Sequence, residues 1–484
     1  MEEEKRFEYE LTTSTKVAQL YLNPATVLAM ADREKGYLST SVTVRDLVQN
    51  DITRLVELKE VESKVKTLAK SGEVLACKLH VTGGPDSATG FSHYNQDGIL
   101  GQDDSLLSEH YMSLLLVAEN GDEIWRNPNP QSDTFCRPRS LNWTKETDKL
   151  SKHMFDQFFR EIDEMNENPL DVQISGITMK IMVSGMYTLI DGKVANAIVN
   201  NRNTHACPLC VEDADPRVGP SFFHSRLNMV EWLIRYAGKN KVEGHPALSH
   251  PDVKAACRKI ADELEHFFKL HVNRPKIGGS GSSNNGNMAR RLLADPGNFS
   301  RILGVRKDLV ENLRLISSLA LSSNHLDSKK VAELFKTIMK QLDREFPDAR
   351  QIPPCIHKYK HLSEMVKRLP YTMNFVDEQA GERCHKRYKF TRPHLARKTS
   401  PEDSINDMMK TALAWSDVKF AHLDAKNTRK LRVDDEDFNQ KLASFYASNE
   451  YDGDYEEIPV ISASDDDMSS DYEDNVSTDS DDEE

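Results

Sequence analysis

DEQAGERCHKRYKFTRPHLARK, residues 377–398, is an acidic start followed by a strongly basic continuation. We predict that it forms a helix, on which positions four apart share a face, so Glu382 and Lys386 point the same way. A carboxylate held among cations suits an enzyme that places a metal ion beside a phosphodiester. A solvated, salt-bridged helix face has the same pattern, so the rest of the chain has to decide between the two interpretations.

The composition is that of a soluble globular protein. Hydrophobic residues make up 38% of the 484 residues and charged residues 29%, and a chain of this length can hold two or three domains. No apolar run approaches the roughly 20 residues that a membrane span needs, and the start, MEEEKRFEYE, does not resemble a signal peptide. Seven cysteines without a secretion signal indicate a reducing compartment, where metal binding is more common than disulfides.

The charge is unevenly distributed along the chain. The net charge is −14, but residues 434–484 contain 20 acidic residues and one lysine, a net of −19. Residues 1–433 therefore hold 62 basic and 57 acidic residues, a net of +5. A mildly basic body with an acidic tail is compatible with a nucleic-acid partner, without identifying one.

Two aspartates follow segments that we predict to be strands. Residues 74–81 (VLACKLHV) run into Gly-Gly-Pro-Asp, so we expect Asp86 just past a strand end. Residues 177–190 are a long apolar run, expected to be a central strand, and end at Asp191. Each aspartate also has a simpler explanation, because Pro-Asp is common in turns and Asp-Gly between apolar segments is a strong hairpin signal.

Two groups of metal-binding residue types lie far apart in the chain. Cys207 and Cys210 are spaced so that both thiolates can bind one tetrahedral zinc. Cys355, His357 and His361 lie together in CIHKYKH, and two histidines four apart on a helix can share a metal. Either pair alone is more often coincidental than a site. Together they favour a structural zinc.

The chain divides into five segments. They are an N-terminal helical segment (1–70), the first part of an α/β core (71–200), a helical insertion (201–375), a closing helix with a basic segment (376–433), and an acidic tail (434–484). The glycine-rich stretch at 277–287 lacks the Lys-Ser/Thr of a phosphate-binding loop, so we do not interpret it as a nucleotide site. The tail is acidic, serine-rich and poor in aliphatic residues, and we expect it to be disordered.

Six motifs together resemble one family, the DDE transposases that include the Transib elements, their invertebrate relatives and the catalytic subunit of the V(D)J recombinase. The motifs occur in the family's order and span roughly residues 73–420. They are PDSATGFSHY (85–94), IWRNPNPQSDTFCRP (124–138), LIDGKVANAIVN with CPLC (189–210), NNGNMARRLL (284–293), CIHKYKHLSEM (355–365) and DEQAGERCHKRYK (377–389).

The resemblance implies an RNase H-like α/β core, interrupted by a large helical zinc-binding insertion. It implies that Asp86, Asp191 and Glu382 are the catalytic carboxylates and bind Mg²⁺ or Mn²⁺. The implied zinc ligands are Cys207, Cys210, His357 and His361. The chemistry of such a site is two-metal-ion phosphodiester cleavage and joining, which needs no side-chain nucleophile and would comprise nicking, hairpin formation and strand transfer.

The resemblance also implies that the protein binds DNA, forms a homodimer that pairs two DNA ends, and works in the nucleus. It leaves open whether an accessory subunit is needed. Basic residues beside the acid centre would hold DNA phosphates without reading sequence. These residues are Lys386, Arg387, Lys389, Arg392, Arg397 and Lys398.

The chain departs from the family pattern at three places. Ser87 stands where the family has a glycine, and His385 where it has an asparagine. The two histidines of the zinc site are four residues apart rather than five, which keeps Cys355 open as a ligand. A second interpretation is therefore a host-adopted descendant that binds DNA or chromatin without cutting it, favoured by the acidic tail and the short N-terminal segment. A third, a zinc-stabilised scaffold unrelated to DNA, requires all six motifs to be accidental.

Overall fold

The structure is a computed structural model that describes most of the chain between residues 38 and 447. The described ranges are 38–89, 105–201, 206–212, 214–244, 246–272, 286–347, 353–427 and 435–447. The predictions for residues 1–37, for most of the glycine-rich stretch at 277–287 and for the tail beyond 447 lie outside them. Within these ranges, no helix has the length and apolar character of a membrane span.

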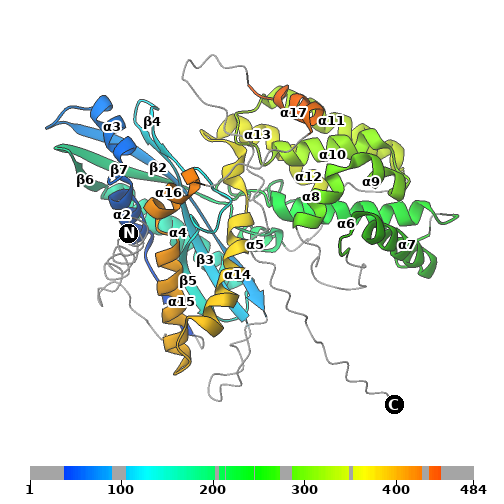
Figure 1. The fold of residues 1–484 in the computed structure, drawn as a ribbon, viewed down its shortest axis with the longest axis horizontal. Coiled ribbons are helices and arrows are strands. Elements are labelled where there is room, and N and C mark those ends of the chain that lie inside the picture. The colour runs from blue at the N-terminus through cyan, green and yellow to red at the C-terminus, as the bar shows by residue number, and fades with distance from the viewer. Residues whose placement is uncertain are drawn as a thin grey trace, which may run out of the picture.

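A seven-stranded mixed sheet forms one half of the protein (Figure 1). Its strand order is β1-β5-β3-β2-β7-β6, with β4 paired to β3. Strands β2 and β7 are parallel, and the other pairs are antiparallel. The strands are β1 (Leu38–Ser41), β2 (Val74–Thr89), β3 (Ser105–Ala118), β4 (Glu123–Arg126), β5 (Arg137–Trp143), β6 (Leu170–Ile174) and β7 (Ile177–Tyr187).

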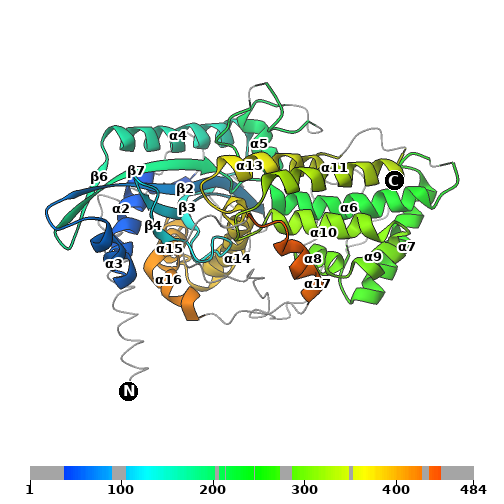
Figure 2. The ribbon, with the colours of Figure 1, turned by 90° about the horizontal axis from the view of Figure 1, so that it is seen from above.

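Helices cover both faces of the sheet (Figure 2). Helix α4 (Asp148–Glu167) packs on one face against β2 and β7, through an apolar side that includes Phe155, Phe158, Phe159 and Ile162. Helix α14 (Gln379–His394) and helix α15 (Pro401–Trp415) cover the other face, against β2 and β5. Helix α16 (Val418–Asn427) follows α15. The mixed sheet between helical layers agrees with the predicted α/β class.

The described part of the N-terminal segment contains one strand followed by two helices. Its first described element, β1, is a strand that pairs with β5 at the edge of the sheet. Helices α2 (Val44–Leu55) and α3 (Lys59–Leu68) then pack against β3 and β4. A buried ion pair from Arg54 to Asp417, 2.8 Å long, joins α2 to the segment before α16. Residues 38–70 therefore belong to the sheet half of the protein.

Strand β2 is longer than predicted, so Asp86 lies inside a strand rather than in the turn after one. The pairing with β3 continues from Gly83 opposite Tyr111 to Thr89 opposite Ser105. The glycines serve close packing: a Cβ on Gly83 would lie 2.6 Å from the Phe158 ring, and one on Gly84 would collide with the backbone of Leu189. The absence of side chains on these two glycines lets the sheet approach α4 and the chain after β7.

A group of helices follows the sheet and forms the other half of the protein (Figure 1). Most of it falls within residues 201–375, for which the sequence predicts a helical insertion, and its role as a zinc-binding insertion stays a prediction. Helix α5 (Gly192–Ile198) precedes it and packs against α4. The elements of the group are α6 (Phe222–Asn240), α7 (Pro251–Phe268), α8 (Gly286–Ala294), α9 (Pro296–Leu303), α10 (Lys307–Leu319), α11 (Ser328–Glu345), α12 (Pro354–His357), η2 (Lys358–His361), α13 (Leu362–Arg368) and η3 (Met373–Val376).

The beginning of the acidic tail is ordered, in contrast to the predicted disorder from residue 434. Helix α17 (Glu436–Ala443) packs on the helical half. Asp435 forms an ion pair of 2.8 Å with Arg314, whose guanidinium lies 3.7 Å from the centroid of the Phe438 ring. Two aromatic residues near its end, Phe445 and Tyr446, also pack against the core. The composition of the tail predicts disorder, but contacts of Phe438, Phe445 and Tyr446 and the ion pair with Arg314 hold α17 against the helical half.

Candidate metal centres

The first candidate centre lies where β2 meets the start of α14. Asp86 is on β2, and Glu382 and His385 are on α14. Their ligand atoms all lie within 4.8 Å of one another. His385 Nδ1 is 3.5 Å from Asp86 Oδ2, and its Nε2 is 3.0 Å from the Ser108 hydroxyl on β3. Two of the three predicted catalytic carboxylates are therefore brought together, although nearly 300 residues of chain separate them.

The third predicted carboxylate, Asp191, lies at the same end of the sheet. After β7 the chain continues beside β2, with the Leu189 amide donating to the Gly83 carbonyl over 3.1 Å. Asp191 is then the N-cap of α5, and its Oδ1 accepts a hydrogen bond of 2.8 Å from the Val194 amide. The Asp-Gly pair is thus a helix start and not the hairpin that it could also have indicated.

The negative charges of Glu382 and Asp191 both act on the Asp86 carboxyl. Burial raises the pKa of Asp86 well above its usual range, and the negative charges of Glu382 and Asp191 raise it further. Carboxylates that repel one another in a buried site favour a bound cation, which offsets the repulsion. Their hard oxygen atoms are ligands of the kind that Mg²⁺ and Mn²⁺ prefer. The residues present therefore fit a divalent metal centre.

His224, which the sequence pattern did not indicate, orients Glu382. It lies in the first turn of α6, and its Nε2 donates to Glu382 Oε1 over 3.1 Å while its Nδ1 lies 3.1 Å from Glu378 Oε1. Burial alone would lower the pKa of His224, but the hydrogen bonds to the two carboxylates outweigh it and raise this pKa to about 11. The resulting imidazolium holds Glu382 in one orientation and lowers the pKa of that carboxyl, against the effect of burial.

Glu378 ties the helical half to α14 at this point. The Ser221 side chain makes no capping hydrogen bond to α6 and instead donates to Glu378 Oε1 over 2.5 Å. The backbone amide of His224 donates to the same oxygen over 2.9 Å. The Glu378 carboxylate thus caps the N-terminus of α6. A helix N-terminus favours a negative charge. No local spacing signals this contact, because its partners come from opposite halves of the protein.

Asp377, beside Glu378, is a buried acid whose two carboxylate oxygens have no hydrogen-bond partner within the described ranges. Burial raises its pKa to about 7, and repulsion from Glu378 adds to the rise. The ordinary value is 3.8, so the folded chain binds this proton more tightly than the unfolded chain. The stability from this proton is complete below about pH 4 and is lost as the pH rises through about 7.

Asp377→Asn is expected to stabilise the protein at pH 8 relative to wild type, and to keep only a smaller part of this advantage at pH 5, because asparagine cannot ionise in the buried site. A difference of three pKa units corresponds to at most about 4 kcal/mol. Urea unfolding at both pH values measures the effect, with Asp437→Asn, an exposed acid on α17, as the matched control. Equal destabilisation of Asp377→Asn at pH 5 and pH 8 would contradict the argument.

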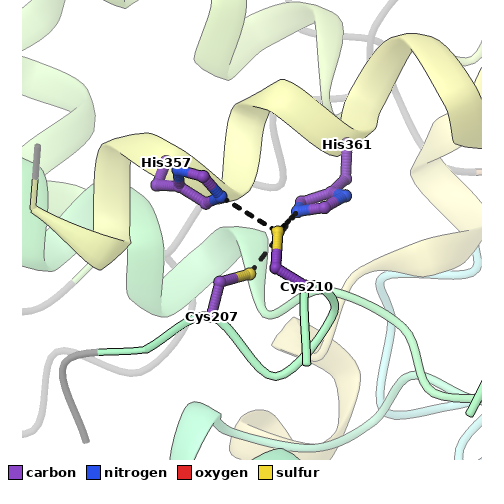
Figure 3. A group of neighbouring side chains, drawn as sticks. All are labelled: Cys207, Cys210, His357 and His361. Carbon is purple, nitrogen blue, oxygen red and sulfur yellow. Dashed lines mark hydrogen bonds between the residues drawn. The ribbon is translucent and has the colours of Figure 1, made fainter. Parts of the chain in front are cut away.

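The second candidate centre is formed by Cys207, Cys210, His357 and His361, the four residues that the family resemblance implies (Figure 3). The Cys210 sulfur lies 3.2 Å from His357 Nε2 and 3.1 Å from His361 Nε2, and the Cys207 sulfur lies 3.5 Å from His361 Nε2. In a tetrahedral zinc site, sulfur and nitrogen ligands are separated by about 3.5 Å. The four side chains therefore have the spacing of a zinc site.

The protonation behaviour of this centre fits a metal as well. Burial lowers the pKa of His361 to about 4, so its imidazole is neutral and can ligate. Burial also raises the pKa of the Cys207 thiol to about 11, a cost that a bound cation removes. Cys355, the alternative ligand, is buried outside this group, and burial raises its pKa to about 12.

The six basic residues predicted to hold DNA are of two kinds. Exposed ones are Lys386, Lys389, Arg397 and Lys398, and less accessible ones are Arg387 and Arg392. Arg387 forms an ion pair with Asp133, and the Arg392 guanidinium lies 4.3 Å from the centroid of the Trp143 ring. Arg397 also pairs with Asp407 over 2.8 Å. The side chains of Lys386, Lys389 and Lys398 are therefore exposed to solvent at or beyond the basic part of α14.

Comparison with known proteins gives only weak structural likeness. No family model matches the sequence, and no curated protein matches it. Among solved structures, the chain is similar to the Drosophila P element transposase strand transfer complex, at 9% identity, over 70% of this chain and 77% of that chain, with a TM-score of 0.37. A likeness this weak carries no argument about family or activity, so the resemblance to Transib elements stays a prediction from the motifs.

Proposed function

We propose that this chain is a transposase-type enzyme that cuts and joins DNA, with Asp86, Asp191 and Glu382 as the ligands of two Mg²⁺ or Mn²⁺ ions. The convergence of Asp86 and Glu382, with Asp191 close enough to raise the pKa of Asp86, is the observation that supports this best. Metal ions bound there would activate water or a DNA 3′-hydroxyl and stabilise the leaving oxygen. Nicking, hairpin formation and strand transfer are the proposed reactions.

The chain's own residues prepare this site. His224 fixes the orientation of Glu382 through a hydrogen bond of 3.1 Å, and His385 lies against Asp86 where it is held by Ser108. Burial lowers the pKa of His385 to about 4, so this side chain is neutral and adds no positive charge that would compete with a metal ion. The replacement of the family's asparagine by histidine is therefore compatible with the proposed chemistry.

We further propose that Cys207, Cys210, His357 and His361 hold a structural zinc ion. The site joins the loop after α5 to the segment formed by α12 and η2. Asp191 is the N-cap of α5. A zinc ion held here would therefore fix the loop that follows α5, close in sequence to a proposed ligand of the acid centre. A closed site of four protein ligands is typical of structural rather than catalytic zinc.

DNA is the proposed partner, in a homodimer that pairs two DNA ends in the nucleus, with or without an accessory subunit. Lys386 and Lys389 are exposed on α14, one and two turns after Glu382. Lysines in this position would contact phosphates on either side of the acid centre and contribute affinity without base specificity.

The test is nicking of supercoiled plasmid by the purified full-length chain with Mn²⁺, with Mg²⁺ and after addition of EDTA. Metal-dependent nicking is the expected result. A chain that binds DNA in a salt-sensitive manner but nicks neither plasmid nor linear duplex with either metal would contradict the proposed cleavage, and would favour the non-cutting DNA-binding descendant.

A further inference from the structure

Lys358 is a buried lysine that neither candidate metal centre uses. It lies between His357 and His361 in the sequence and is only 8% exposed. Across the described ranges, no carboxylate forms an ion pair with it and no hydrogen bond joins it to a cysteine sulfur. A lysine ammonium without a charged partner among the described residues is free to bind an anion such as phosphate.

The ammonium group lies between the two centres. A Cβ built on Gly192 would be 3.0 Å from Lys358 Nζ, which places the ammonium against the turn that begins with Asp191. On its other side, the positive charge of Lys358 acts on the Cys207 thiol and favours its ionised form. Lys358 thus reaches from the cysteine–histidine centre to the edge of the acid centre.

Charge balance argues against a role for Lys358 in the zinc site. A zinc ion with two thiolates and two neutral histidines has no net charge, so it needs no additional cation. Metal ions in the acid centre, in contrast, would bring the anionic DNA backbone to Asp191. A lysine ammonium is a common point-charge ligand for phosphate, and that of Lys358 lies against Gly192, the residue after Asp191, with no ion-pair partner among the described residues.

We propose that Lys358 binds a DNA phosphate adjacent to the acid centre, on the Asp191 side. The inference rests on the proposed function, because only DNA held at Asp86, Asp191 and Glu382 passes within reach of this ammonium. Lys386 and Lys389 follow Glu382 on α14, whereas Lys358 would supply a phosphate contact next to Asp191. The helical half of the protein thereby takes part in binding the substrate.

The test is Lys358→Met, which removes the charge and keeps most of the side-chain stem. Lys360→Met is the matched control, because Lys360 is two residues away in η2 and exposed. Binding of a short fluorescent DNA duplex is measured at several salt concentrations with Ca²⁺, and zinc content by mass spectrometry. Lys358→Met is expected to weaken binding roughly 10- to 100-fold and to reduce the salt slope by about one, with unchanged zinc, whereas Lys360→Met leaves affinity and slope as in wild type.

Two results would overturn the proposal: a wild-type affinity and salt slope in Lys358→Met, or loss of zinc from that variant with the salt slope of wild type. Failure of the wild-type chain to nick DNA counts against the proposed cleavage alone, because the binding measurement does not depend on cutting. If Lys358→Met does not fold, Gly192→Ala replaces it. The added methyl would lie 3.0 Å from Nζ and displace the ammonium, so weaker DNA binding is expected, and an unchanged affinity contradicts the proposal.

Discussion

Glu382→Gln is expected to abolish metal-dependent DNA nicking while leaving the fold and DNA binding intact. Glutamine keeps the shape of the side chain and can still accept the hydrogen bond from His224, which in the wild type is 3.1 Å long. It removes the negative charge that a divalent cation needs. The nicking rate is expected to fall at least about 1,000-fold, the scale for loss of a group on which the chemistry depends. Plasmid nicking with Mn²⁺ measures this directly.

The matched control for this variant is Glu402→Gln, on the exposed first turn of α15. It makes the same chemical change far from the acid centre and should nick at the wild-type rate. Thermal unfolding and DNA binding are measured on both variants, so that a folding defect is recognised. If Glu382→Gln nicked as fast as wild type, the cleavage would not occur at the acid centre and the assignment of Asp86, Asp191 and Glu382 would fail.

Cys210→Ser is expected to release a zinc ion and to destabilise the helical half of the protein. Cys210 has the shortest separations in its centre, 3.1 and 3.2 Å to the two histidines, and its loss leaves only three ligands. Structural zinc binding in small domains is worth about 10–16 kcal/mol, so this is expected to be the largest effect of any single substitution on the free energy of unfolding. Native mass spectrometry gives the zinc content, and thermal unfolding with and without EDTA gives the stability.

Cys355→Ser separates the two ligand sets that the sequence left open. Cys355 is buried outside the four-residue centre, so this variant should retain its zinc and lose only packing energy. Zinc lost from Cys355→Ser and retained by Cys210→Ser would instead show that Cys355 is a ligand. Wild-type protein that binds no zinc at all would contradict both sets.

The ligand pairs of the cysteine–histidine centre could be predicted from the sequence, because the spacing within each pair is local. Cys207 and Cys210 are three positions apart, and His357 and His361 are one helical turn apart. The surroundings of the acids were predicted less well. The sequence predicts Asp86 just past a strand end, with a Pro-Asp turn as the alternative, whereas pairing with β3 extends the strand through it and Gly83 packs closely against Phe158.

The sequence by itself determined the chemical inventory: three separated carboxylates, a cysteine pair, a histidine pair, a basic helix and an acidic tail. Tertiary structure alone decided that His224 orients Glu382, that Glu378 caps α6, and that the Lys358 ammonium lies against Gly192. The physical reason is that local spacing encodes which side chains share a helix face or a turn. Burial and charge pairing between distant segments depend on which surfaces the whole chain brings into contact.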